Sequence, residues 1–315
     1  MKIAVLGSGA MGSLYGTYLS QSEEVTMVDV LPDLVDHINR QGIRGMEPDG
    51  QVKQYSVRAV QSGEDIGIQD IVLVFVKGMY TKTVIQQNLS MIGEHTWVVT
   101  LQNGAGNNRD IAAFVPRERI FVGTSSHNCV VKGMGVYSHS GNGPTNIGPD
   151  MINANTVENA RKIAEVFSRC GFETYVIPNI QEVLWEKIFV NCGINALSMI
   201  MRQPIGAVRT NPFLWNICKR ITYECVMVAE ADGTYFDRAE ALKSVEQVCV
   251  NNSDGLASMY QDSMNGRLTE IDRINGIIVE LGAEYRIDVP YNRMLVEMVH
   301  GAETASGIRK FDSCY

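Results

Sequence analysis

The chain has 315 residues, of which 45% are hydrophobic and 20% are charged, and its formal net charge is −8. That length can bury a sizeable core and is typical of two domains. The acidic balance, with a pI near 5.2, disfavours a general nucleic-acid binder or a protein that docks on anionic membranes, because both need basic surface. A small anionic substrate stays compatible, since a few local cations are enough to bind one.

The start of the chain and its cysteines favour a cytoplasmic protein. The first folded element begins at once, in "MKIAVLGSGAMG", with no basic region or cleavage site before it, so secretion is not expected. No stretch approaches the roughly 18 apolar residues of a membrane-spanning helix. The cysteines are odd in number and lack CxxC spacing, so we expect reduced core residues and neither a metal site nor a disulfide framework. They are Cys129, Cys170, Cys192, Cys218, Cys225, Cys249 and Cys314.

Short, branched, apolar segments alternate with helical patterns over the first half of the chain. The segments 2–7, 24–29, 70–77, 97–102 and 119–124 are typical of strands covered on both faces. Helical patterns occupy 11–21, 32–40, 79–88 and 107–114. This alternation predicts βαβ units and a mostly parallel sheet, that is, an α/β fold. The glycine-rich segment 130–148 predicts an antiparallel meander at the sheet edge, followed by a helix at 156–169 and a strand at 172–177.

Strand patterns almost disappear from Ile180 onward. Helices are predicted at 180–201, 212–231, 237–250, 267–281 and 290–302, with Asn211 as the cap and Pro212 in the first turn of the second one. The sequence therefore predicts an α/β domain over 1–178, a helical domain over 179–315, and a cleft between them.

The stretch "VLGSGAMGSLYG" carries the spacing GxGxxG after a strand and at the start of a helix. Gly7 permits a tight turn, Gly9 lets the backbone approach a pyrophosphate, and Gly12 lets helix and strand pack closely. The helix amino terminus adds free N–H groups and partial positive charge for the phosphates. This context predicts dinucleotide binding, whereas the motif by itself could be only a structural turn.

Asp29, at the end of the second strand, indicates which dinucleotide. A carboxylate there can accept hydrogen bonds from the adenosine ribose hydroxyls but would repel a 2′-phosphate. No Arg or Lys follows in "DVLPDLVDH", so we predict NAD rather than NADP. The alternative is that Asp29 or Asp33 only caps the next helix.

Lys187, Asn191 and Asn195 stand four residues apart in "WEKIFVNCGIN". On a helix they would form one polar stripe about 12 Å long. The stripe is either an ordinary solvated face or the wall of a wet cleft, and spacing alone favours the former. A desolvated lysine there could act as a proton donor.

A second set of polar residues follows near the carboxyl terminus. Ser258 and Glu270 are separated by the probable turn "MNGR" and could converge, whereas Asp272 and Arg273 are expected as surface charges on the next helix. Asn103, in "LQNGAG", ends a predicted strand at the sheet edge where ligands of α/β folds bind. It is equally well explained as part of an Asn-Gly turn.

Together these stretches resemble the ketopantoate reductase (2-dehydropantoate 2-reductase) family along nearly the whole chain. The matching segments are "IAVLGSGAMGSLYG", "VKGMYT", "LQNGAG", "GTSSH", "WEKIFVNCGINALS", "SMYQD…RLTEIDRINGIIV" and "HGAE". The resemblance implies a Rossmann-type amino-terminal domain, a helical carboxyl-terminal domain, and hydride transfer from a nicotinamide cofactor to a 2-oxo acid.

The resemblance also implies a role for individual residues. Lys187 matches the catalytic proton donor, Glu270 an acid near the cofactor ribose and that lysine, and Asn103 the asparagine at the junction of cofactor and substrate. These three are the implied catalytic residues. Asn191, Asn195 and Ser258 match substrate contacts. The implied cofactor residues are Gly7, Ser8, Gly9, Ala10, Met11, Gly12, Asp29, Lys77, Asn103, Cys129 and Glu270.

Two departures from the family pattern affect the expected substrate and cofactor. Val30 stands where many members carry an Arg for the 2′-phosphate, and Ile205 stands where ketopantoate-specific members often carry an Asn. Both are similar to NAD-dependent D-2-hydroxyacid dehydrogenases of the mandelate or hydroxyisocaproate kind. Ketopantoate and other C3-branched 2-oxo acids therefore both stay open, as does, more remotely, a non-catalytic NADH-sensing module. The resemblance also suggests a homodimer and an R (D) alcohol product.

Overall fold

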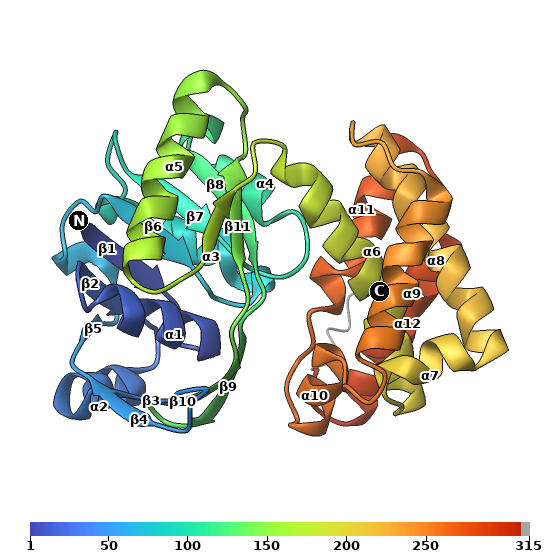
Figure 1. Cartoon of the computed structure of the whole chain (residues 1–315), viewed down its shortest axis with the longest axis horizontal. Coiled ribbons are helices and arrows are strands. Elements are labelled where there is room, and N and C mark those ends of the chain that lie inside the picture. Colours follow the sequence, from blue (N-terminus) through green and yellow to red (C-terminus); the bar gives the residue numbers. More distant parts are fainter. Residues whose placement is uncertain (310–315) are drawn as a thin grey trace. The chain divides into compact units, whose positions relative to one another are not determined.

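The computed structural model describes residues 1–309 of the chain (Figure 1). It divides into two compact units. The amino-terminal unit comprises Met1–Gln102 and Asn107–Ile180, and the helical unit comprises Asn103–Gly106 and the residues from Gln181 onward. The sequence predicts one uninterrupted amino-terminal domain, so the grouping of 103–106 with the helices is a difference. It arises because the Ala105 amide donates to the carbonyl oxygen of Arg273 at 3.0 Å.

An eight-stranded sheet forms the centre of the amino-terminal unit, in the order β12-β11-β8-β7-β6-β1-β2-β5. Its strands are β1 (Lys2–Leu6), β2 (Glu24–Val28), β5 (Arg58–Val60), β6 (Ile71–Val74), β7 (Trp97–Thr100), β8 (Ile120–Ser125), β11 (Thr145–Pro149) and β12 (Thr174–Val176). All neighbours pair in parallel except β8 and β11, which pair antiparallel. The predicted, mostly parallel α/β sheet is confirmed.

A second sheet of four strands departs from the prediction. Its order is β4-β3-β10-β9, with β3 (Ile43–Met46), β4 (Val52–Tyr55), β9 (Asn128–Gly133) and β10 (Val136–Gly141). The predicted meander over 130–148 is thus divided: β9 and β10 pair antiparallel in this small sheet, and β11 joins the large one. The strands in 43–60 have no predicted counterpart, because charged and polar residues interrupt their apolar pattern.

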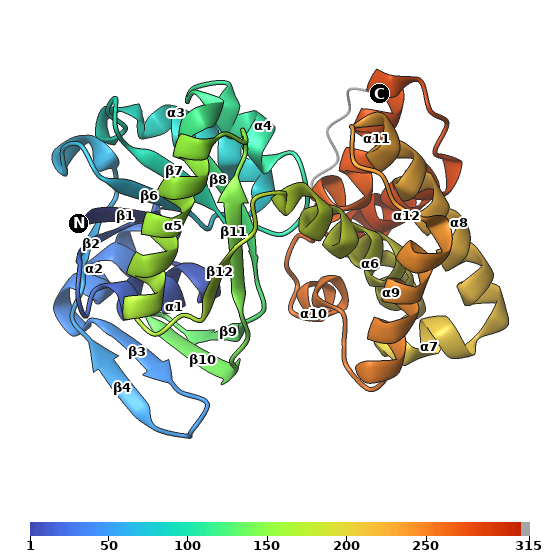
Figure 2. The same ribbon diagram turned by 45° about the horizontal axis from the view of Figure 1, so that its top comes forward.

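Six α-helices accompany these sheets in the part of the chain that the structure describes. They are α1 (Ala10–Leu19), α2 (Pro32–Gln41), α3 (Thr81–Gln87), α4 (Asn107–Ala112), α5 (Ala154–Arg169) and α6 (Ile180–Met201). Only the first residue of α6 belongs to this unit. Short 3₁₀ turns are η1 (Gly63–Asp65), η2 (Gly78–Tyr80), η3 (Leu89–Met91) and η4 (Arg117–Arg119). Helices α1 and α5 lie on the same face of the large sheet (Figure 2). There the ring of Tyr15 stacks on that of Phe172, with 4.1 Å between centroids.

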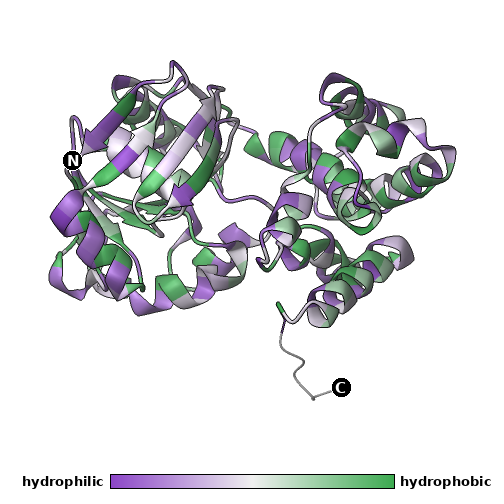
Figure 3. Cartoon of the chain, turned by 90° about the horizontal axis from the view of Figure 1, so that it is seen from below, coloured by the Kyte–Doolittle hydropathy of each residue, from purple (hydrophilic) through white to green (hydrophobic). Residues whose placement is uncertain are grey.

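The helical unit is built around one hydrophobic cluster. It contains most of α6, followed by α7 (Ile205–Thr210), α8 (Pro212–Ala231), α9 (Arg238–Asn251), α10 (Ser258–Met264), η5 (Ile271–Arg273), α11 (Asn275–Tyr285) and α12 (Pro290–Ala305). Hydrophobic and hydrophilic residues share most of these ribbons, as expected of helices with one apolar face (Figure 3). Asn211 caps α8 as predicted, accepting from the amides of Phe213 and Leu214.

Two parts of the helical prediction are wrong. The helix predicted over 267–281 begins only at Asn275, after the separate turn η5, and α7 and α10 were not predicted. The reason is that backbone groups in 267–274 bond to other elements instead of continuing a helix; for example, the Thr269 backbone amide donates to the Glu303 carboxylate of α12 at 2.8 Å. Asp272, expected as a surface charge, is partly exposed and pairs with Arg309 at 3.0 Å.

The sequence-based expectation that no stretch approaches a membrane-spanning helix is wrong for helix α6. By length and composition this helix passes as a candidate membrane span. However, 61% of its most apolar stretch is buried inside the protein. Its apolar side chains, such as Ile188 and Phe189, belong to the hydrophobic cluster. Gly193 permits close packing, because a Cβ there would meet the Cys218 sulfur of α8 at 3.0 Å.

Six of the seven cysteines lie in the described residues and are free thiols. Five of these are buried, and Cys129 is half-buried. Cys314 lies outside the described residues.

Candidate functional site

The glycine-rich turn lies at the point where the strand order of the large sheet reverses. β1 has β2 on one side and β6 on the other, so the carboxyl ends of β1 and β6 border the crevice in which open α/β sheets bind ligands. Gly7 follows β1 with φ of +95°, and a Cβ there would come within 3.0 Å of the Val76 backbone. Glycine is therefore required both by the backbone conformation and by the close approach of the segment that follows β6.

The first turn of α1 has free hydrogen-bonding capacity. Its N-cap is Gly9, which supplies no side-chain cap, and no acidic residue stands in the first turn. A Cβ on Gly9 would meet nothing within 4 Å, whereas one on Gly12 would lie 1.9 Å from the Gly7 carbonyl oxygen. Beside them the Ser8 hydroxyl is buried and has no hydrogen-bond partner. An open approach, uncapped N–H groups and an unpaired hydroxyl together fit an anionic group such as a pyrophosphate.

Asp29 joins this turn to the end of β2. Its carboxylate accepts hydrogen bonds from the Ser8 amide at 2.7 Å and from the Leu31 amide at 3.1 Å. Helix α2 has Leu31 as its N-cap residue and Asp33 in its first turn. Asp29 therefore does more than precede a helix, since it fixes the glycine turn itself.

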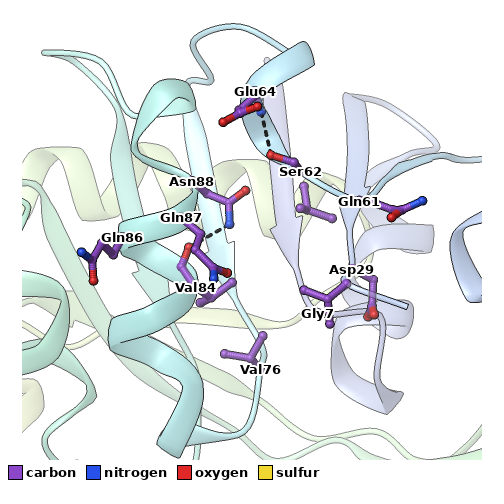
Figure 4. Close-up of a pocket in the computed structure, with 12 residues that line it drawn as sticks. Gly7, Asp29, Gln61, Ser62, Glu64, Val76, Val84, Gln86, Gln87 and Asn88 are labelled. Atoms are coloured by element: carbon purple, nitrogen blue, oxygen red, sulfur yellow. Dashed lines mark hydrogen bonds between the residues drawn. The ribbon is translucent and has the colours of Figure 1, made fainter. Parts of the chain in front are cut away.

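A pocket of about 530 Å³ opens beside Asp29 and Gly7 (Figure 4). The ends of β1 and β2 form one wall, the segment after β5 a second, and α3 a third. Of the described residues that line it, two are carboxylates and none is Lys or Arg. They are Gly7, Val28, Asp29, Val30, Gln61, Ser62, Glu64, Val76, Val84, Gln86, Gln87 and Asn88.

Sequence reasoning missed the second and third walls of this pocket. The buried Asn88 holds them together: its carbonyl oxygen accepts the Gly63 amide at 2.7 Å, and its amide nitrogen donates to the Val84 carbonyl at 2.8 Å. Ser62 in turn accepts the Glu64 amide at 3.3 Å. No local motif marks these residues, because the pocket exists only once β5 and α3 are placed next to β2.

The remaining predicted cofactor residues of this unit lie on neighbouring loops. Lys77 is half-buried at the start of η2, directly after β6. Gln102, after β7, donates to the Val76 carbonyl at 2.6 Å and so ties these two loops together. Ala10 and Met11 begin α1, and Cys129 on β9 lies against that helix, with its sulfur 3.4 Å from the Ala10 carbonyl oxygen. Burial raises the pKa of the Cys129 thiol to about 12, so this cysteine is no thiolate at neutral pH.

The polar stripe predicted on 187–195 is confirmed as part of one helix, α6. Lys187 and Asn191 are half-buried and Asn195 is buried. The stripe therefore differs from an ordinary solvated helix face. Buried amides and amines of this kind need polar partners.

Lys187 has an unusual electrostatic environment. Desolvation by burial lowers the pKa of its amine below the ordinary lysine value, and the charge of Glu270 opposes this by raising it. A lysine with a lowered pKa can give up a proton at a lower pH than a surface lysine can. Glu270 stands at the N-cap of η5, so two elements of the helical unit combine at the amine.

The predicted substrate contact Ser258, the predicted catalytic residue Asn103 and the family departure Ile205 lie at separate places in the helical unit. Ser258 is exposed and begins α10. Asn103 is half-buried in the segment 103–106, whose Gly104 has φ of +84° and packs against the Arg273 carbonyl. Ile205 is only 7% exposed and belongs to the hydrophobic cluster.

Comparison with known proteins supports this reading of the two units. The family described as "Ketopantoate reductase PanE/ApbA" matches residues 3–150, and "Ketopantoate reductase PanE/ApbA C terminal" matches residues 179–303. The 2-dehydropantoate 2-reductase of Halobacterium salinarum is 33% identical over 306 residues, covering 96% of this chain and 99% of that protein. The enzyme of that name from Lactococcus lactis is 31% identical, covering 96% and 98%.

A solved structure resembles the whole chain. The ternary structure of D-mandelate dehydrogenase with NADH and anilino(oxo)acetate has a TM-score of 0.90 and 29% sequence identity, covering 98% of this chain and all of that one. The amino-terminal and carboxyl-terminal descriptions of one family thus match this chain, and so do relatives along their full length. The chain belongs to the ketopantoate reductase family of nicotinamide-dependent oxidoreductases.

Proposed function

We propose that this protein reduces a C3-branched 2-oxo acid to the corresponding (R)-2-hydroxy acid, with 2-dehydropantoate or a close analogue as substrate. The observation that carries the proposal is the desolvated Lys187, whose charge is opposed by burial and supported by Glu270. The full-length relatives named 2-dehydropantoate 2-reductase support the substrate class.

Lys187 would act as the general acid. When bound, the reduced nicotinamide supplies the hydride. Negative charge develops on the carbonyl oxygen of a 2-oxo acid as it is reduced, and an ammonium group held at that oxygen stabilises the charge and donates a proton. Desolvation by burial lowers the lysine pKa, and the charge of Glu270 opposes this, so Glu270 would favour the protonated amine.

Asn103, Asn191, Asn195 and Ser258 would fix the substrate. Amide and hydroxyl groups can bind a carboxylate and a carbonyl without adding charge, and orientation of this kind turns an encounter into an aligned reaction. The apolar neighbours of the α6 stripe suit a branched side chain. Ile205 lies in the hydrophobic cluster. That it favours a branched or aromatic substrate side chain stays a prediction.

We propose NAD as the cofactor. Gly7 to Gly12, including Ser8, Ala10 and Met11, would hold the pyrophosphate, and Asp29 would bind the adenosine ribose. Two carboxylates and no cation among the described residues of the adjoining pocket disfavour a 2′-phosphate. Lys77, Cys129, Asn103 and Glu270 stay predicted cofactor neighbours.

An NAD-dependent D-2-hydroxyacid dehydrogenase is the second candidate. The structure of D-mandelate dehydrogenase with NADH, at a TM-score of 0.90, favours it, as does Val30, which is 68% exposed beside Asp29 where a 2′-phosphate would need a cation. The homodimer, the cytoplasmic location and the lack of nucleic-acid or membrane partners stay predictions.

A substrate panel separates the candidates. The purified full-length protein is incubated with NADH and, in turn, ketopantoate, 2-oxoisovalerate and phenylglyoxylate, and absorbance at the reduced cofactor band is followed. Ketopantoate fastest supports the leading proposal, and phenylglyoxylate fastest supports the second candidate. No turnover of any 2-oxo acid with NADH or NADPH would refute both.

A further inference from the structure

A cluster of two carboxylates, one guanidinium and one imidazole binds the segment that carries Glu270. We call Asp272, His300, Glu303 and Arg309 the carboxyl-terminal anchor. Arg309 connects two elements: its Nε donates to Glu303 at 2.8 Å and its Nη2 to Asp272 at 3.0 Å. His300 Nε2 lies 2.6 Å from the other Asp272 oxygen. One guanidinium thus joins a carboxylate of α12 to a carboxylate of η5.

Glu303 is the buried member of the anchor. It is 1% exposed, so its charge needs full compensation by hydrogen bonds. One of its oxygens accepts the Thr269 backbone amide at 2.8 Å, and the other accepts from Arg309. Thr269 directly precedes Glu270, so this contact fixes the backbone immediately before the residue whose charge acts on Lys187.

The other end of the same segment is bound to α6. The Cys192 sulfur donates to the Ile274 carbonyl at 3.4 Å, and the Asn275 side chain donates to the Cys192 carbonyl at 3.2 Å. The segment 269–275 is therefore held between α12 and α6. It also supports the segment 103–106, because the Arg273 carbonyl accepts the Ala105 amide at 3.0 Å.

We propose that the carboxyl-terminal anchor positions Glu270 against Lys187, so that Glu303 and Arg309 act as positioning residues of the reaction. This inference rests on the proposed roles of Lys187 and Glu270. Two other carboxylates, Glu182 and Glu186, are on the same helix as Lys187, and both are exposed. Glu270, on a different element, is the carboxylate whose charge acts on the Lys187 amine. If the anchor is released, Glu270 moves, its support of the ammonium weakens, and the amine loses its proton at lower pH.

The test measures the Lys187 pKa without turnover. The reactivity of Lys187 toward acetic anhydride is followed across pH by mass spectrometry in the full-length protein and in Glu303→Gln, Glu270→Gln and the double variant. Glu303→Gln keeps an acceptor for the Thr269 amide but loses the ion pair. We expect it to lower the Lys187 pKa by at least half a unit, and to add less than a further 0.2 unit in the Glu270→Gln background.

Kinetics give a second readout with a matched control. Glu303→Gln should lower kcat about tenfold and leave the KM for NADH within twofold. Glu246→Gln, which breaks the Arg209–Glu246 pair (2.6 Å) elsewhere in the helical unit, should change neither by more than twofold. If Glu303→Gln does not fold, Arg309→Gln replaces it with the same criteria.

The inference is overturned if the Lys187 pKa stays unchanged in the anchor variants, or if the Glu303 and Glu270 effects add fully. Failure of the proposed function is a different result: no 2-oxo acid is reduced by the unmodified protein, while the labelling experiment still decides whether the anchor acts on Lys187.

Discussion

At the scale of single residues, two opposed influences meet at one amine. Burial removes water from Lys187 and disfavours its charge, whereas Glu270 favours it. Spacing along the sequence predicts the polar stripe of α6, but it cannot reveal desolvation, because that depends on packing by the rest of the helical unit. The lowered pKa therefore follows from burial in the folded protein and not from the sequence pattern, and it predicts a pH dependence.

The pH dependence of kcat for reduction should follow the protonation of Lys187. If Lys187 is the general acid, reduction needs its protonated amine, which is present below its pKa, so we expect kcat to fall as pH rises through a value below that of ordinary lysine. In Glu270→Gln this descending limb should move to lower pH, because Glu270 raises the pKa. Steady-state kinetics at saturating substrate across pH measure both curves. A limb at the same pH in both proteins would show that Glu270 does not act on the ionising group.

Asp29 is the residue that decides between NAD and NADP in this account. Asp29→Asn keeps an oxygen for the Ser8 amide but removes the charge that would repel a 2′-phosphate. We expect the ratio of kcat/KM for NADH to that for NADPH to fall about tenfold, equivalent to about 1.4 kcal/mol. Asp33→Asn, in the first turn of α2, is the matched control and should leave the ratio within twofold. An NADPH preference in the unmodified protein would contradict the assignment.

At the scale of elements, two glycines of one turn have different physical roles. A Cβ on Gly12 would lie 1.9 Å from the Gly7 carbonyl oxygen, whereas one on Gly9 would meet nothing within 4 Å. Gly9 also has an ordinary φ of −69°. Gly12 is therefore needed for folding of the turn, and Gly9 for access to it.

Alanine variants should separate these roles. Gly12→Ala should destabilise the ligand-free protein by about 1–3 kcal/mol through overpacking. Gly9→Ala should leave its melting temperature nearly unchanged and raise the Kd for NADH at least tenfold. Thermal unfolding and fluorescence titration measure the two effects. Equal NADH affinity in Gly9→Ala and in the unmodified protein would show that the pyrophosphate does not bind at this turn.

Elements with strong, local patterns could be predicted, and elements that depend on distant partners could not. The strands before Gly7 and Asp29 and the helix from Asn211 follow from apolar runs, caps and spacing. The small sheet and the turn η5 do not: β3 depends on pairing with β10, which is far away in sequence, and the segment that leads into η5 depends on the contact of the Thr269 amide with Glu303. The same reason explains why the pocket wall at Asn88 and the carboxyl-terminal anchor were missed: each residue acquires its role from a neighbour far away in sequence.

At the scale of the whole molecule, the family match extends over both units. The descriptions cover residues 3–150 and 179–303, and the glycine turn and the α6 lysine lie in separate halves. The amino-terminal unit provides a dinucleotide-type turn and an acidic pocket, and the helical unit provides a desolvated amine beside a carboxylate. Each unit supplies a part that the proposed reduction needs, so removing the amine should stop the chemistry and spare the cofactor.

Hydride transfer in Lys187→Ala therefore tests the central claim most directly. We expect kcat with the best 2-oxo acid to fall by about 10²–10⁴, the range for loss of a general acid, while the Kd for NADH changes less than threefold and the melting temperature does not fall. Single-turnover oxidation of bound NADH measures the chemical step. A rate within threefold of the unmodified protein would contradict the account.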